Sequence, residues 1–285
     1  MSEPTRSADV WADLRRTTQA RIGLGRAGNS LPTQRVLEFQ AAHAAARDAV
    51  HDPLDVPAFI AHLEDLGIES PRHVRSRADS RGEYLRRPDL GRAPADLSEL
   101  PRTDADIGIV LADGLSPRAL VDHGRGMLAA LVDTLGPRYR IAPPVVATQA
   151  RVALGDHIGE ALGVTTLIVV IGERPGLSVA DSLGIYLTHR PRPGRTDADR
   201  NCISNIHPPD GLGYAAAADI TARLVAGARD LGRSGGGTER HLASRDRRRG
   251  DDSDRRLTVT DGSRDQEARI LAFCAANSSS VRIPR

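Results

Sequence analysis

The sequence predicts an α/β protein in which a Rossmann-like, mostly parallel sheet domain is preceded by a helical N-terminal domain. Apolar residues recur at helical spacing through residues 1–100, whereas residues 101–233 alternate short apolar runs with helical segments. One of those runs, residues 167–171, reads Leu-Ile-Val-Val-Ile, which is typical of a strand buried on both faces of a parallel sheet. Alternating strands and helices favour a parallel sheet covered by helices.

The helical N-terminal domain is expected over residues 1–100. Its first helix has an apolar stripe at spacings of three and four, made of Val36, Phe39, His43, Ala46 and Val50. A second helix begins at Pro57, the favoured first position, and ends before Gly67. We find no strand-like alternation here, and we expect extended stretches near residues 21–33 and 84–94.

The α/β domain is expected over residues 101–233. Four apolar segments predict its strands, at residues 107–112, 141–147, 167–171 and 185–188. Ser116-Pro117 supplies a cap and a first-turn proline for the helix that follows the first strand. A short helix from Asp156 to Gly163 and an Ala-rich helix that ends at Gly232 complete the alternation.

Residues 234–285 are expected to form a charged, mostly disordered tail. The segment opens with Ser-Gly-Gly-Gly and continues with dense mixed charge. A short helix is expected near residues 266–275. Removing residues 234–285 should leave activity unaffected, because this composition does not support a packed core.

Composition excludes several classes of protein. The 285 residues carry 39 basic and 37 acidic side chains, a net charge of +2, and every basic residue is arginine. Aromatic residues make up only 3%, too few for a stacking platform, so we expect no nucleic-acid partner. No apolar run reaches the ~18 residues of a membrane span and the polar start is not that of a signal peptide, which predicts a cytoplasmic protein without a membrane partner. Two cysteines exclude a disulfide framework and a four-cysteine zinc site.

Ligands of an open α/β sheet bind beyond the carboxyl ends of its strands. The segments expected to meet there are residues 112–116, 149–152, 172–176 and the loop after Tyr186. Glu173 directly follows a buried strand, where a carboxylate gains nothing from the core. It is either a ligand contact or the ion-pair partner of Arg174 or of another nearby arginine.

Residues 200–207, Arg-Asn-Cys-Ile-Ser-Asn-Ile-His, are predicted to form a partly buried loop because they combine hydrogen-bonding side chains with two isoleucines. Two interpretations of Cys202 stay open: a nucleophile with His207 as its base, or a small packing residue. One cysteine and one histidine lack the further ligands of a metal site. Residues 23–28 fit G-x-G-x-x-G, yet no helix opens after them, so we expect an extended segment that lies on a surface such as that of another subunit.

Five blocks of this sequence, in order, resemble the small subunits of adenosylcobalamin-dependent ethanolamine ammonia-lyase. The resemblance spans roughly residues 10 to 232 and rests on residues 20–28 (ARIGLGRAG), 84–92 (YLRRPDLGR), 113–116 (DGLS), 172–177 (GERPGL) and 199–207 (DRNCISNIH). Five blocks in family order are far more specific than any single motif in the chain. The segment after Gly232 resembles no part of that family.

The resemblance implies an enzyme that converts ethanolamine and other vicinal amino alcohols to an oxo compound, acetaldehyde from ethanolamine, and ammonia by radical rearrangement. A large subunit would hold the substrate, and this chain would close the adenosylcobalamin site from the other side. The resemblance carries three cofactor contacts over: Val152 through apolar surface or backbone, Glu173 as an acceptor for corrin amides, and Cys202 by packing. It implies no catalytic residue in this chain and, because D-x-H-x-x-G is absent, no protein ligand to cobalt. A bacterial microcompartment is the alternative location.

Two other functions remain in view. A stand-alone α/β enzyme for a nucleotide or phosphate ligand, with Glu173 and Cys202 lining its crevice, would be active without a partner. An arginine-rich nucleic-acid binder acting through residues 234–285 would bind a DNA column with steep salt dependence.

Overall fold

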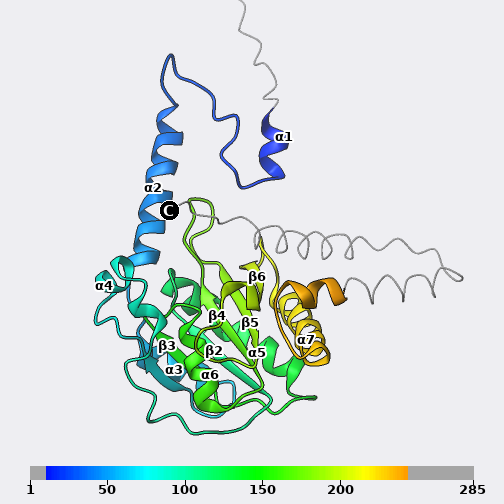
Figure 1. The fold of residues 1–285 in the computed structure, drawn as a ribbon. Coiled ribbons are helices and arrows are strands. Elements are labelled where there is room, and N and C mark those ends of the chain that lie inside the picture. Colours follow the sequence, from blue (N-terminus) through cyan, green and yellow to red (C-terminus); the bar gives the residue numbers. More distant parts are fainter. Residues whose placement is uncertain (1–10, 243–285) are drawn as a thin grey trace, which may run out of the picture.

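The structure is a computed structural model that describes residues 11–242, and it is a mixed α/β fold built on one six-stranded sheet (Figure 1). The strands are β1 (Arg72–Arg75), β2 (Ile107–Ala112), β3 (Val145–Thr148), β4 (Thr166–Gly172), β5 (Leu183–His189) and β6 (Arg200–Ile206). The helices are α1 (Trp11–Arg16), α2 (Thr33–His51), α3 (Val56–Glu64), α4 (Arg81–Arg86), α5 (Pro117–Leu135), α6 (Leu154–Leu162) and α7 (Tyr214–Leu231), with short 3₁₀ turns η1 (Leu90–Arg92) and η2 (Asp197–Asp199).

The strand order is β1-β3-β2-β4-β5-β6. β1, β3, β2 and β4 are parallel, whereas β5 is antiparallel to β4 and β6 is antiparallel to β5. After β2 the chain forms β3 on one side and then crosses to form β4 on the other side. The carboxyl ends of β2 and β4 therefore flank the point where the strand order reverses, which is where ligands bind in open α/β sheets.

The two faces of the sheet are covered unequally. α5 and α7 pack on one face with α3 beside them, and the buried cluster there includes Ile109, Ile168, Ile185 and Ile203. On the other face α6 packs over β2 and β4. On that second face Tyr186 of β5 and Cys202 of β6 remain only half-buried. The sheet is thus accessible beside α6, on its antiparallel strands.

The strands predicted at residues 107–112 and 167–171 are confirmed as β2 and β4, and the strand predicted at 141–147 is the shorter β3. All six residues of β2 are buried, and Ser116 caps α5 by accepting a hydrogen bond from the Ala119 N–H at 3.2 Å. α6 ends at Gly163, whose φ of 71° is the left-handed conformation that glycine adopts readily. The sheet and its crossover helices follow the alternation read from the sequence.

Four expectations about local structure were wrong. Residues 1–100 do contain a strand, β1, which pairs with β3 at the edge of the sheet. Residues 84–94 are not extended throughout, because they include the end of α4 and the η1 turn. Residues 200–206 are strand β6 rather than a loop. The strand expected at 185–188 exists but runs antiparallel to β4.

Residues 234–242 pack against the body of the protein. Ser234 accepts a hydrogen bond from the His189 N–H at 2.9 Å, and the Gly235 N–H donates to Asn201 at 2.9 Å. Thr238 is completely buried. Residues 243–285, with the short helix expected near 266–275, lie outside the described residues, and the division of the chain at 100 and 233 stays a prediction. No helix within residues 11–242 is long and apolar enough to cross a membrane.

Candidate functional site

The ends of β2 and β4 approach each other closely. The Leu115 N–H donates to the Gly172 carbonyl at 3.0 Å. A Cβ at Gly114, where φ is +55°, would lie 2.2 Å from that carbonyl oxygen, and a Cβ at Gly172 would lie 2.0 Å from the Ser116 carbonyl oxygen. Glycine is therefore required at both positions for this approach. The result is a compact strand-end platform from which Glu173 emerges.

Glu173 begins the hairpin that joins β4 to β5, residues 173–182. Its N–H donates to the Ser182 carbonyl at 3.0 Å, and the Gly176 N–H donates to the Val179 carbonyl at 2.7 Å to close the turn. The Ser182 hydroxyl donates to Glu173 Oε2 at 2.7 Å, and the Asn205 N–H donates to the same oxygen at 3.3 Å. Of the two interpretations of Glu173, the ion pair with Arg174 is not seen between these two described residues, and the donors to the carboxylate are neutral.

The other carboxylate oxygen, Glu173 Oε1, lies over Gly184 of β5, at 2.9 Å from where a Cβ would stand. Within residues 11–242 both of its hydrogen bonds go to Oε2, so Oε1 retains acceptor capacity. Burial raises the pKa of Glu173 above its ordinary value, while the bonds from Ser182 and Asn205 oppose that rise. Because the carboxylate is largely removed from solvent, a hydrogen bond that it accepts from a ligand is stronger than the same bond in water.

Tyr186 contacts Cys202 on the neighbouring strand. It pairs with Cys202 across β5 and β6, and the two side chains form a hydrogen bond. Burial raises the pKa of the Tyr186 hydroxyl, and Cys202 and Glu173 raise it further through their own negative charge when ionised. Tyr186 was predicted to lie on a strand but was not assigned to the site. No local pattern marks its role, because that role depends on the antiparallel pairing of β5 with β6.

Val152 lies in the turn that leads from β3 into α6. It packs against the same apolar cluster as Tyr186, which places both on the α6 side of the sheet. The three predicted cofactor contacts, Val152, Glu173 and Cys202, thus lie on the α6 side of the sheet.

Asp113, which directly follows β2, is a structural residue. Its carboxylate accepts hydrogen bonds from the Gln149 and Ala150 N–H groups at 2.8 and 3.0 Å and lies 3.5 Å from an Arg81 nitrogen. The Tyr84 ring is placed between two guanidinium groups, with Arg81 at 4.9 Å and Arg151 at 4.7 Å from its centroid. Sequence analysis gave none of these cation–π partners, because they come from segments far apart in the chain.

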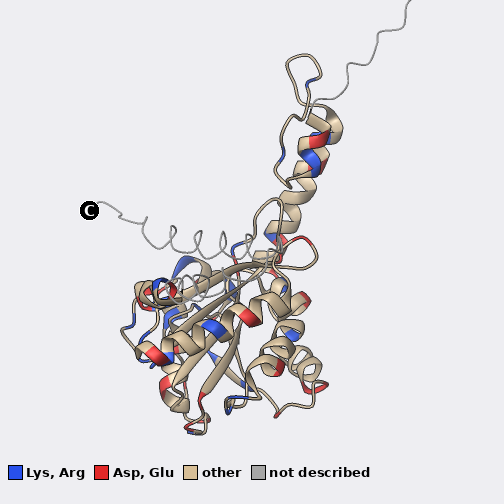
Figure 2. Cartoon of the chain, turned by 90° about the vertical axis from the view of Figure 1, so that its right-hand side faces the viewer, with Lys and Arg blue, Asp and Glu red and all other residues tan. Residues whose placement is uncertain are grey.

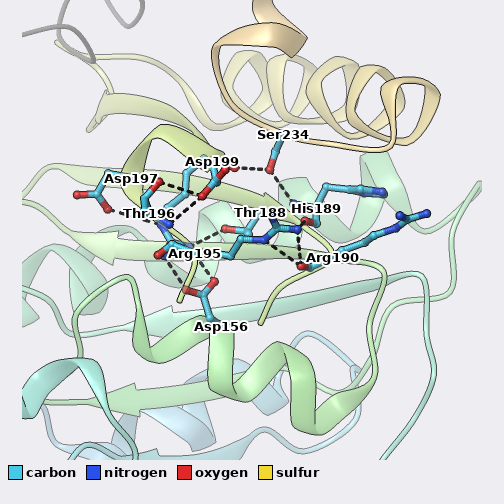
Figure 3. A network of polar contacts seen from close by, with 10 residues as sticks. Asp156, Thr188, His189, Arg190, Arg195, Thr196, Asp197, Asp199 and Ser234 are labelled. Atoms are coloured by element: carbon cyan, nitrogen blue, oxygen red, sulfur yellow. Dashed lines mark hydrogen bonds and ion pairs between the residues drawn. The ribbon is translucent and has the colours of Figure 1, made fainter. Parts of the chain in front are cut away.

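The loop after Tyr186 does not join the site, which corrects the expectation. Because β5 is antiparallel, its end lies beside the start of β4, where His189 pairs with Thr166. A separate polar network occupies that region (Figure 3). Arg200 donates to both carboxylate oxygens of Asp156 at 2.8 and 2.7 Å and to Thr188 at 2.8 Å. These contacts tie α6 to β5 and β6.

The nucleophile interpretation of Cys202 gains no support from the geometry. His207 Nε2 is bonded to Asn205 Oδ1 at 2.9 Å, and the sulfur is paired with Tyr186. No group of three or more histidine, cysteine, aspartate and glutamate side chains is placed to hold a metal ion in the described part of the chain. The groups that are present, a buried carboxylate and half-buried apolar side chains, can hold a ligand by contact and hydrogen bonding.

Comparisons with known proteins identify the family. Residues 8–237 match the family model described as "Ethanolamine ammonia-lyase light chain (EutC)". The "Ethanolamine ammonia-lyase small subunit" of Rhodococcus erythropolis is 69% identical over 227 residues, which is 80% of this chain and 88% of that protein. The protein with the same name from Ralstonia nicotianae is 48% identical over 75% of this chain and 82% of its own length. The one from Xanthomonas campestris pv. campestris is 50% identical over 76% of this chain and 83% of its own length. The chain therefore belongs to the ethanolamine ammonia-lyase light-chain family, whose members are subunits of a lyase that acts as a complex.

Proposed function

We propose that this chain, together with a large subunit, forms an adenosylcobalamin-dependent ammonia-lyase that converts ethanolamine and related vicinal amino alcohols to an oxo compound and ammonia. The chain closes the cobalamin site on the side opposite the large subunit. The observation that carries the proposal is the group formed by Val152, Glu173, Tyr186 and Cys202 on the accessible part of the sheet. The location, cytoplasmic or inside a microcompartment, stays a prediction.

The residues present suit a corrin cofactor. Corrin side chains end in amides, which donate hydrogen bonds, and Glu173 Oε1 is an acceptor with remaining capacity. Gly184 leaves space under that carboxylate that a larger residue would fill. Val152, Tyr186 and Cys202 are each half-buried and present mainly apolar atoms. A flat apolar ligand with amide groups at its rim fits this combination.

Each residue then has a defined role. When bound, the cofactor supplies the radical chemistry of the rearrangement. Glu173 orients the ligand by accepting amide hydrogen bonds, and the bonds from Ser182 and Asn205 hold the carboxylate in place. Val152 and Cys202 contact the ligand and exclude water, and Tyr186 supports Cys202. Glu173 supports this placement, because it directly follows β4, whose carboxyl end flanks the point where the strand order reverses.

The test is co-purification with the large subunit, followed by the absorption spectrum of bound corrinoid. We expect the wild-type complex to retain cobalamin and the Glu173→Ala complex to lose most of it while keeping the same subunit stoichiometry. Glu160→Ala is the matched control, because Glu160 is an exposed carboxylate on α6. Unchanged cobalamin affinity in Glu173→Ala would refute the assignment of Glu173.

The stand-alone α/β enzyme is distinguished by the same preparation. If the purified chain alone bound nucleotides or turned over a substrate, and added large subunit had no effect, the proposal would fail. We expect ammonia release from ethanolamine and adenosylcobalamin only when both subunits are present.

A further inference from the structure

The N-terminal arm, defined as residues 11–39, extends beyond the body of the protein. It comprises α1, the segment that follows it and the first turns of α2. Both views show this part of the chain projecting away from the sheet (Figures 1 and 2). The single buried residue of α2 is Ala49, near its far end. The arm is therefore joined to the body mainly at its base and at one further contact described below.

The arm exposes most of the large apolar side chains that face solvent in residues 11–242. Only Val121 and Leu177 lie outside it, and the others are Trp11, Leu14, Leu31, Val36, Leu37 and Phe39. Leu37 is 59% exposed and Phe39 is 44% exposed. The apolar stripe predicted for the first helix is thus left uncovered at its N-terminal end. Apolar surface gathered in one region of this kind marks an interaction site.

The arm has a defined shape. Gly23, at a φ of +56°, lies so close to the Trp11 ring that a Cβ would stand 2.1 Å from it. Ala27 and Ser30 exchange two backbone hydrogen bonds of 2.7 and 3.1 Å, which close a turn. The G-x-G-x-x-G motif therefore shapes a turn on the arm, in place of the phosphate-binding loop that the pattern can also form.

The arm touches the body next to the candidate site. Arg21 donates to the Leu177 carbonyl at 2.9 Å, and the Ser178 hydroxyl donates to the Gln19 carbonyl at 3.2 Å. Leu177 and Ser178 form the turn of the hairpin that begins at Glu173. Leu177 is itself 37% exposed, so the apolar surface of the arm continues onto this hairpin.

The charge of the arm is one-sided. Residues 11–39 contain five arginines (Arg15, Arg16, Arg21, Arg26 and Arg35) and two acidic residues (Asp13 and Glu38), so the net charge of the arm is 5 − 2 = +3. Two such arms packed against each other would bring like charges together, which disfavours a second copy of this chain as the partner. The partner that complements the arm is therefore a protein with an apolar surface bordered by acidic side chains.

We infer that the arm surface, made of the exposed apolar residues of residues 11–39 together with Leu177, is the docking site for the large subunit. The inference rests on the proposed function, because a partner that shares the cofactor must approach the Glu173 hairpin. The arm contacts that hairpin through Arg21 and Gln19, and its exposed apolar side chains lie beyond this contact. The large subunit accordingly contributes an apolar patch bordered by carboxylates.

The experiment compares the full-length chain with a Leu37→Asp/Phe39→Asp variant for association with the large subunit in the absence of cofactor. Both side chains are largely exposed, so folding should be retained, as urea unfolding will verify. Val121→Asp is the matched control, because Val121 is 50% exposed and lies on α5 outside the arm. We expect the arm variant to bind the large subunit about tenfold or more weakly, and wild-type binding to weaken as salt rises.

Three outcomes would overturn the inference. In the first, the arm variant binds the large subunit as tightly as the wild-type chain does; in the second, Val121→Asp loses as much affinity as the arm variant. In the third, the wild-type chain forms a dimer by itself, and Leu37→Asp/Phe39→Asp abolishes that dimer. The last outcome would assign the surface to a second copy. Failure of the wild-type complex to retain corrinoid would instead contradict the proposed function, and it would leave the assembly result unaffected because assembly is measured without cofactor.

Discussion

The role of Cys202 is set by its neighbour Tyr186. Its position opposite Tyr186 on the accessible side of the sheet makes its size more important than its thiol chemistry. We expect Cys202→Ser to keep the affinity for corrinoid within about threefold, because serine preserves the side-chain volume and the hydrogen bond to Tyr186. We expect Cys202→Trp to lower that affinity by more than about tenfold, because the indole ring fills the site. The measurement is cobalamin retained per complex. Equal, complete loss of turnover in both variants would point to chemistry at the sulfur.

The Arg200–Asp156 pair is expected to dominate local stability, because both side chains are 1–2% exposed and two hydrogen bonds join them. Arg200→Met leaves a buried carboxylate without its partner, and we expect it to lower the free energy of unfolding by about 3–5 kcal/mol. Arg118→Met is the control, since the Arg118–Asp122 pair is largely exposed and should be worth about 1 kcal/mol or less. Urea unfolding measures both, and similar losses would contradict the role given to burial.

At the scale of single elements, the position of α6 depends on close packing against the sheet. A Cβ at Gly155 would lie 2.6 Å from Val169 Cγ2 on β4. We expect Gly155→Ala to destabilise the protein by about 1–3 kcal/mol and to weaken corrinoid retention, because Val152 lies in the turn that leads into α6. Gly82→Ala is the control in another helix, since no atom lies within 4 Å of its added Cβ. It should be neutral or slightly stabilising in the same unfolding assay.

The elements also show what the sequence can and cannot predict. The apolar runs at 107–112 and 167–171 predicted β2 and β4 because both strands are buried on both faces. The direction of β5 was missed, although residues 173–182 are too few and too irregular for the crossover that a parallel strand needs. β1 was missed because Arg72–Arg75 is a short edge strand with only one buried residue.

The same reasoning applies to the candidate site. Glu173 and Val152 could be placed at strand ends from the pattern alone. Tyr186 could not, because its role depends on the antiparallel pairing that brings it opposite Cys202. The buried ion pair of Asp156 with Arg200 joins residues 44 positions apart, a contact that no local pattern encodes.

At the scale of the whole molecule, two truncations separate the packed segment from the residues that follow it. A chain ending at residue 242 keeps the contacts of Ser234, Gly235 and Thr238, and we expect its free energy of unfolding to equal that of the full chain. A chain ending at residue 233 loses the bonds to Asn201 and His189 and the buried Thr238 side chain. We expect it to be destabilised by about 2–4 kcal/mol, the sum of a few buried hydrogen bonds and one apolar contact. Equal stability of the two truncated chains would show that residues 234–242 contribute nothing.

The hairpin of residues 173–182 carries the Glu173 carboxylate at its base and the anchoring point of Arg21 at its turn. A partner that orders the turn also restricts the base, so less freedom is left to lose when a ligand engages the carboxylate. Thermodynamic linkage then works in both directions. If docking of the partner raises the affinity for the coenzyme by some factor, bound coenzyme raises the affinity for the partner by the same factor. Loading with coenzyme and recruitment of the second polypeptide would in that case reinforce each other within one short stretch of backbone.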